Sequence, residues 1–201
     1  MKKICALFLT VLLTAAMLAG CSPSDGELME GKWKGQADLA AAYKSLLAGA
    51  DPTVASHIHL EEFTVALTLR FDEDGTYRLR ADQEDLEAGA EQMEEAIRAG
   101  LAAYMQAQTG KTMENLLAAA GMTMDEVMEQ YFGADLAQVM RQNLESEGTY
   151  RVSGGKLILM DGEGSKVFEG KYDVDEETLK LKSGVTSDLI ASLLPLELER
   201  K

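Results

Sequence analysis

Two histidines and a glutamate occupy alternate positions just before the most strand-like segment of the chain. They are His57, His59 and Glu61, and the protein has no other histidine. Residues two apart on a strand project from the same face, and imidazole and carboxylate groups on one face can bind Zn²⁺ if a further ligand comes from elsewhere. These residues are therefore a candidate metal site. The simpler interpretation is a polar rim ahead of the apolar stretch that begins at Phe63.

Methionines form a second group that could bind a metal. Seven of the eleven methionines fall between residues 83 and 145, where Met122, Met124 and Met128 lie close together. Thioether clusters can bind Cu(I). Methionine more often fills irregular helix interfaces or lines an adaptable apolar groove, and we favour that interpretation.

Motifs of catalysis and of calcium or nucleotide binding fail on their spacing. Gly110-Lys111-Thr112 resembles the end of a P-loop, but Met105 stands where the first glycine belongs. Asp72-Glu73-Asp74-Gly75 lacks the spacing of an EF-hand and has the composition of a hairpin turn. No Gly-x-Ser-x-Gly motif is present. We therefore expect a protein that is not an enzyme and needs no cofactor.

Four aromatic residues are candidates for lining a ligand cavity. They are Trp33, Tyr77, Tyr150 and Tyr172, each within a strand-like segment. Cavities in small barrels are mostly apolar with a few polar groups. The alternative is that these side chains fill the core.

The N-terminus has the layout of an exported protein. A basic start, Met1-Lys2-Lys3, precedes an apolar run to Ala19, which is shorter than the roughly 20 residues of a membrane span. Leu18-Ala19-Gly20-Cys21 resembles the lipobox of bacterial lipoproteins. The resemblance implies that residues 1–20 are a signal peptide, that Cys21 is acylated and labels with palmitate, and that this lipid anchors the chain to the bacterial cell membrane, facing outside the cytoplasm. Residues 21–30 then read as a flexible tether.

Charge and cysteine content limit the partners and the source of stability. Removing Lys2 and Lys3 leaves 17 basic residues against 34 acidic ones, a net charge near −17, which disfavours nucleic acid. Cys5 leaves with the signal peptide, so the folded part has no disulfide. An apolar core must stabilise it, and we expect a monomer.

The apolar pattern changes period twice along the chain. Apolar residues alternate with polar ones from Phe63 to Phe71 and again around Tyr77, which predicts a β-hairpin. At residues 83–145 they recur at three- and four-residue steps, which predicts helices. Short strand-like segments separated by turns return after Glu147 and predict an antiparallel meander.

Two motifs carry a resemblance to a family. Gly31-Lys32-Trp33 resembles the Gly-x-Trp opening strand of lipocalin-like domains, and the segment from Gly148-Thr149-Tyr150 to Leu159 is similar to the meander of uncharacterised lipocalin-like lipoproteins of bacteria. The resemblance implies an α+β fold over residues 31–201, a small antiparallel lipocalin-like β-barrel or curled sheet, with the helical insertion at about 83–145.

These observations favour a non-enzymatic binding module at the cell envelope, held to the membrane through the lipid on Cys21. Its ligand would be an apolar small molecule or an envelope protein. The alternative is a metal-sequestering envelope protein that uses His57 and His59.

Overall fold

Eight antiparallel strands close into a barrel in the computed structural model, which describes residues 24–132, 135–186, 190–191 and 193–201. Each strand pairs with its neighbours in sequence, and β1 also pairs with β8 with Trp33 opposite Arg200. The strands are β1 (Gly31–Asp38), β2 (Thr64–Phe71), β3 (Thr76–Ala81), β4 (Ser146–Ser153), β5 (Lys156–Asp161), β6 (Lys166–Val174), β7 (Thr178–Thr186) and β8 (Leu196–Arg200). The antiparallel barrel with helices that the sequence predicted is therefore present, and closure leaves no strand edge open.

Alternation along the strands builds the barrel core. In β2, Val65, Leu67, Leu69 and Phe71 are buried, whereas the residues between them are exposed or half-buried. A period of two sends every second side chain into the barrel. The other strands contribute further fully buried side chains, which include those of Trp33, Tyr77, Leu157, Phe168, Leu179 and Leu198.

Helices interrupt the strand order at two points. The helices are α2 (Asp25–Met29), α3 (Leu39–Ala50), α4 (Pro52–Ala55), α5 (Gln83–Thr109), α6 (Met113–Ala120), α7 (Met124–Phe132) and α8 (Leu136–Leu144). Asp38, Asp51, Asp82 and Asp135 each cap the helix that follows by accepting hydrogen bonds from backbone N–H groups of its first turn. None of the helices within the described residues has the length and apolar character needed to cross a bilayer.

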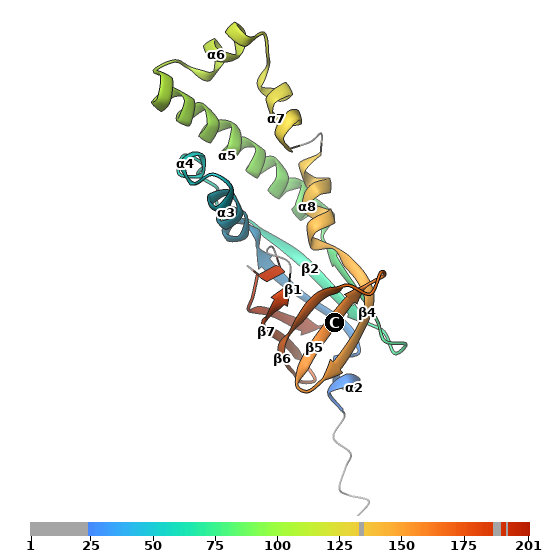
Figure 1. Ribbon diagram of the computed structural model, residues 1–201. Helices are drawn as coiled ribbons and strands as arrows, with labels where there is room; N and C mark the ends of the chain where they lie inside the picture. The colour runs from blue at the N-terminus through green and yellow to red at the C-terminus, as the bar shows by residue number, and fades with distance from the viewer. Residues whose placement is uncertain (1–23, 133–134, 187–189, 192) are drawn as a thin grey trace, which may run out of the picture.

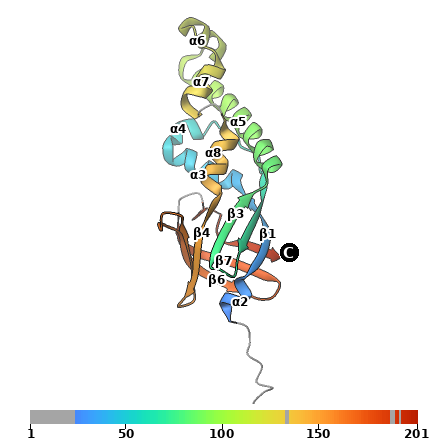
Figure 2. The same cartoon turned by 90° about the vertical axis from the view of Figure 1, so that its right-hand side faces the viewer.

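Helices α5 to α8, which we call the arm, extend from one end of the barrel, while α2 lies at the opposite end (Figures 1 and 2). The chain rises through α5, turns at α6 and returns through α7 and α8 to β4. Helix α5 has 27 residues, so it is about 40 Å long. The arm therefore carries α6 far from the barrel.

Helix α2 closes the end of the barrel that is farthest from the arm. Met29 is fully buried, and its carbonyl oxygen accepts a hydrogen bond from Nε1 of Trp33 at 2.7 Å. Arg200 lies over the Trp33 ring, with its guanidinium carbon 4.3 Å from the ring centroid. The hydroxyl of Tyr172 donates to the Asp25 carboxylate at 2.6 Å. Residues 25–29 are thus a helix fixed to the barrel and not part of a flexible tether, because a capping box and these contacts order them.

The base of the arm is continuous with the barrel. The Asp85 carboxylate accepts a hydrogen bond from the Ala66 N–H at 2.8 Å, and the Ala66 carbonyl accepts one from the Asp82 N–H at 2.8 Å. On the returning side, the Ala81 N–H donates to the Glu145 carboxylate at 3.2 Å. Side chains of α5 and α8 join the apolar core of the barrel. They are Leu86, Ala90, Met93, Ile97, Met140 and Leu144. The base therefore holds the arm at a fixed place on the barrel.

Candidate functional site

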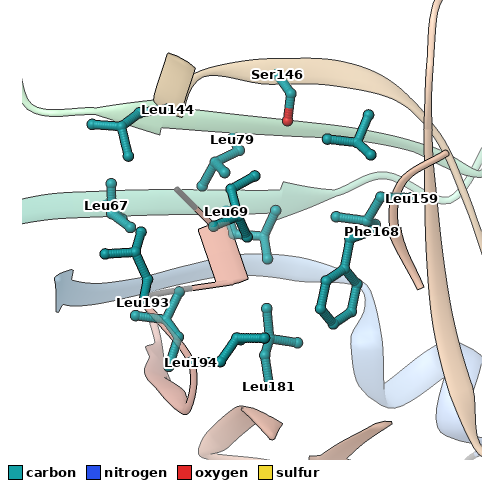
Figure 3. Close-up of a pocket in the computed structure, with 13 residues that line it drawn as sticks. Leu67, Leu69, Leu79, Leu144, Ser146, Leu159, Phe168, Leu181, Leu193 and Leu194 are labelled. Carbon is teal, nitrogen blue, oxygen red and sulfur yellow. The ribbon is translucent and has the colours of Figure 1, made fainter. Parts of the chain in front are cut away.

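Among the residues that the structure describes, buried side chains pack the barrel interior around a small cavity under the arm (Figure 3). Its volume is about 30 Å³, whereas pockets for small-molecule ligands are typically about 300–1,000 Å³. Leucines from several strands line it, including Leu67, Leu69, Leu159 and Leu181, and Leu144 at the end of α8 lies over it. The cavity has room for a solvent-sized molecule only.

Ser146 is the one polar residue among those that line the cavity, and its hydroxyl points in among the leucines (Figure 3). The hydroxyls of Ser146 and Tyr77 are both buried and lack a hydrogen-bond partner of good geometry. Burial raises the pKa of Tyr77, and the nearby Ser146 hydroxyl opposes that rise. Unpaired buried hydroxyls destabilise a fold by about 1–3 kcal/mol each, so this pair stands out in an otherwise apolar interior.

The four aromatic residues predicted to line a ligand cavity do not meet in one. Trp33 and Tyr172 hold α2 at the closed end. Burial, and then the hydrogen bond to Asp25, raise the pKa of Tyr172. Tyr150 is half-buried and packs edge-on against Phe71, with the ring centroids 4.6 Å apart. None of the four lines the 30 Å³ cavity, and in this structure they serve packing and closure.

The histidine cluster lies outside the sheet. Strand β2 begins at Thr64 and α4 ends at Ala55, so His57, His59 and Glu61 lie in a connection and not on a strand face. His57 packs against Tyr104 of α5, with the ring centroids 5.8 Å apart, and His59 is exposed. Across the described residues no three His, Cys, Asp or Glu side chains are grouped so that they could hold a metal ion. The alternative of a metal site at His57, His59 and Glu61 therefore gains no support from the described residues.

Burial ends part-way along the arm. The buried residues of α5 run from Leu86 to Gly100, and the last turns of the helix add none. Helix α6 has no buried residue although its sequence, Met-Glu-Asn-Leu-Leu-Ala-Ala-Ala, is mainly apolar. In α7, Met128 is buried, and an ion pair of 2.7 Å joins Asp125 to Arg98 of α5. The outer part of the arm thus leaves apolar side chains uncovered.

These uncovered side chains form a groove where α6 meets the start of α7, which we call the tip groove. Its volume is about 400 Å³, and it is lined by Met113, Glu114, Leu117, Ala118, Met122, Thr123 and Met124. Three of its seven lining residues are methionines, in line with the adaptable groove favoured from the sequence. Sequence reasoning predicted the two helices but not the groove, since their apolar composition does not reveal which faces stay uncovered.

The tip groove has an acidic surround. Residues 112–132 include Glu114, Asp125, Glu126 and Glu129 but no lysine, arginine or histidine. All four acids are exposed. Glu126 also caps α7 by accepting a hydrogen bond from the Thr123 N–H at 2.7 Å. Glu114 lines the groove itself, Asp125 is paired with Arg98, and Lys111 precedes α6, so the surroundings of the groove are negative on balance.

Comparison of the chain with protein-family models, with curated proteins and with solved structures finds no match. The function must therefore be argued from the geometry of the barrel and the arm.

Proposed function

We propose that this protein is an exported, lipid-anchored protein-binding module, in which a lipocalin-like barrel is a filled support and the arm is the binding element. One contrast carries the proposal. The barrel interior leaves about 30 Å³, whereas the tip groove offers about 400 Å³ lined by apolar side chains. A ligand larger than a solvent molecule would find more room in the tip groove than in the cavity inside the barrel.

The lipocalin-like assignment is supported by the order of the strands and by the first of them. All neighbouring strands in the barrel are consecutive in sequence, as in an up-and-down barrel. The Gly31-Lys32-Trp33 motif opens β1, and Trp33 lies at the end closed by α2 with Arg200 over its ring. The arm replaces the short β3–β4 turn of a plain barrel.

Anchoring at Cys21 would set the orientation of the molecule on the membrane. Cys21 and the signal peptide at residues 1–20 lie outside the described residues, and the first described helix begins at Asp25. Four residues of extended chain span at most about 14 Å, so the end of the barrel at α2 would stay close to the bilayer. The arm leaves from the other end (Figure 1), and α6 would project away from the membrane, where a partner can reach it.

A binding role without catalysis is supported by the chemistry of the concave surfaces. The barrel cavity contains a single hydroxyl, that of Ser146, and otherwise apolar side chains. The tip groove contains one carboxylate, that of Glu114, and one hydroxyl, that of Thr123. Catalytic sites usually combine a nucleophile or base with a group that orients it, and the lining of the barrel cavity supplies no such pair.

Photo-crosslinking in cells tests the proposal. A photoreactive amino acid is placed at Ala119, which is exposed on α6, or at Glu163, which is exposed on the β5–β6 turn and is the matched control. Cys21 is kept, so that the protein is in its natural place. We expect a discrete protein adduct from position 119 and none from position 163. Absence of an adduct at 119, or the same adducts from both positions, would contradict the proposal.

A further inference from the structure

Helix α6 combines an apolar sequence with incomplete burial: Met113, Leu116 and Leu117 are half-buried and its three alanines are exposed. Six of its eight residues are Met, Leu or Ala, and none of them is buried. Its closest apolar neighbour in the tip groove, Met122, is itself 37% exposed. Exposed apolar surface rimmed by polar residues is typical of sites that bind another molecule. The question is which kind of molecule covers this one.

Charge separates the two simplest occupants. A second copy of the chain would bring another acidic arm to the groove, since residues 112–132 carry four acids and no base and the whole chain has a net charge of −15. Like charges across an interface oppose association. A segment with lysine or arginine beside its apolar residues would instead pair with Glu114 and Glu126 while its apolar face covers Leu117 and Met122.

The shape of the groove favours a helix as the occupant. It lies between α6 and the first residue of α7, and Met122 and Thr123 of the connection between the two helices also line it. An amphipathic helix presents apolar anchors at steps of three and four residues along one face, and such a face fits a groove between two helices. Methionine side chains adapt to anchors of different shape because they are unbranched and flexible. The groove can adapt to different anchors in this way because three methionines line it, Met113, Met122 and Met124.

We infer that the tip groove binds a basic amphipathic helix of a partner protein. Its apolar anchors contact Met113, Leu117 and Met122, and its basic residues face Glu114 and Glu126. This inference rests on the proposed function, because it specifies the class of partner that the arm binds.

A designed peptide of about 18 residues, or five helical turns, is the probe. It contains only leucine and lysine in an amphipathic pattern and carries a fluorophore. The fluorescence anisotropy of the peptide is measured while the protein is added. The protein used is the chain from residue 21 onward with Cys21→Ser, and it contains every helix and strand that the structure describes. Two comparators are a leucine–glutamate peptide with the same pattern and a leucine–lysine peptide with a scrambled pattern. We expect saturable binding of the first peptide alone, with an affinity that falls as salt screens the charges.

Variants locate the site. Leu117→Gln with Met122→Gln removes apolar contacts at positions that are not buried, so the fold should be kept, and circular dichroism checks this. We expect it to weaken binding by about tenfold or more, which corresponds to the loss of about one to two buried apolar anchors. Glu114→Lys should weaken binding several-fold. Glu163→Lys makes the same charge change on the barrel and should leave the affinity within about twofold.

Several results would overturn the inference. The leucine–glutamate peptide could bind as tightly as the leucine–lysine peptide, or the variants in the groove could leave the affinity for the leucine–lysine peptide unchanged. The chain could instead self-associate in a way that Leu117→Gln with Met122→Gln abolishes, which would make a second copy the occupant. A protein adduct at position 119 without peptide binding would reject the basic helix and keep the proposed function. Specific peptide binding without an adduct at 119 would support the groove chemistry and contradict the proposed role in the cell.

Discussion

Gly100 of α5 marks the place where the arm is clamped against the connection between α4 and β2. A Cβ atom at this position would lie 2.5 Å from Cγ1 of Ile58, 2.9 Å from the Cα of Ile58 and 3.0 Å from the carbonyl oxygen of His57. Two of these three atoms belong to the backbone, so a change of rotamer cannot make room. Gly100→Ala should therefore push the connection away from the arm.

The magnitude follows from two opposing effects. Replacing glycine by alanine inside a helix is favourable by about 0.8–1.0 kcal/mol, whereas overpacking a tight contact costs about 1–3 kcal/mol. Because two of the crowded atoms belong to the backbone, we take the upper part of the overpacking range, about 2–3 kcal/mol. The net loss of unfolding free energy for Gly100→Ala should then be about 1–2 kcal/mol. Gly49 in α3 is the matched control, because a Cβ there would meet no atom within 4 Å. Gly49→Ala should increase the unfolding free energy by about 0.5–1 kcal/mol.

Thermal unfolding followed by circular dichroism measures both effects. A change of 1 kcal/mol shifts Tm by about 2–4 °C in a chain of this size. We expect Gly100→Ala to lower Tm by about 2–8 °C and Gly49→Ala to raise it by about 1–4 °C. If both variants raise Tm to the same extent, the arm is not clamped at Gly100 and its fixed attachment to the barrel is refuted.

Three further predictions follow from single residues. The Tyr43 hydroxyl is buried without a hydrogen-bond partner, and burial raises the pKa of Tyr43 to about 12. Tyr43→Phe should therefore increase the unfolding free energy measured in urea by about 1–3 kcal/mol. A decrease in the unfolding free energy would instead show that the hydroxyl makes a stabilising hydrogen bond. The pKa of Tyr172 is also raised in the fold, by burial and then by Asp25. As the pH rises, the Tyr172 hydroxyl loses its proton in the unfolded chain before it does so in the folded one. The stabilisation of the fold by the protonated hydroxyl is therefore complete below about pH 10 and decreases as the pH rises further. Tyr172→Phe should make the decrease of Tm with pH above about pH 10 shallower, and an unchanged slope of Tm against pH would refute this. Cys21→Ala should leave Tm unchanged and abolish palmitate labelling and retention in the membrane fraction, whereas labelling that persists would reject acylation at Cys21.

Elements with strong local patterns could be predicted from the sequence. The alternation from Phe63 to Phe71 matches β2, in which Val65 and Leu69 are buried, and Asp72-Glu73-Asp74-Gly75 forms the turn to β3. The three- and four-residue steps after Gln83 match α5. In each case the signal lies within one segment, so side-chain periodicity alone identifies the element.

Features that depend on contacts between distant segments could not be predicted. Closure requires β1 to pair with β8, and nothing within either strand specifies that partner. Helix α3 has mostly small apolar residues, of which Leu39 and Ala42 are buried by contacts with other segments, whereas α4 has no buried residue. The connection that includes His57 has the alternation of a strand, yet it packs against α5. Local pattern was overridden there by packing.

The candidate site illustrates the same limit. The three- and four-residue steps predicted helices at residues 83–145 but not where their apolar faces would be covered. Leu86, Met93 and Ile97 are buried at the base of the arm. Beyond Gly100 the arm has left the barrel, so the residues of α6 are covered only in part: Met113, Leu116 and Leu117 are half-buried and none is fully buried. The length of α5 in space, and not the composition of α6, determines that the groove stays open.

The central claim is that the barrel is a filled support and not a cup for a ligand. Native mass spectrometry of the lipidated protein, released from membranes and compared with the same sample after denaturation, tests this most directly. We expect the native mass to equal the denatured mass both for the wild-type chain and for Ser146→Val, a substitution that places an apolar side chain suited to a strand in the 30 Å³ cavity. A stoichiometric small molecule that is bound by the wild-type chain and absent from Ser146→Val would contradict it.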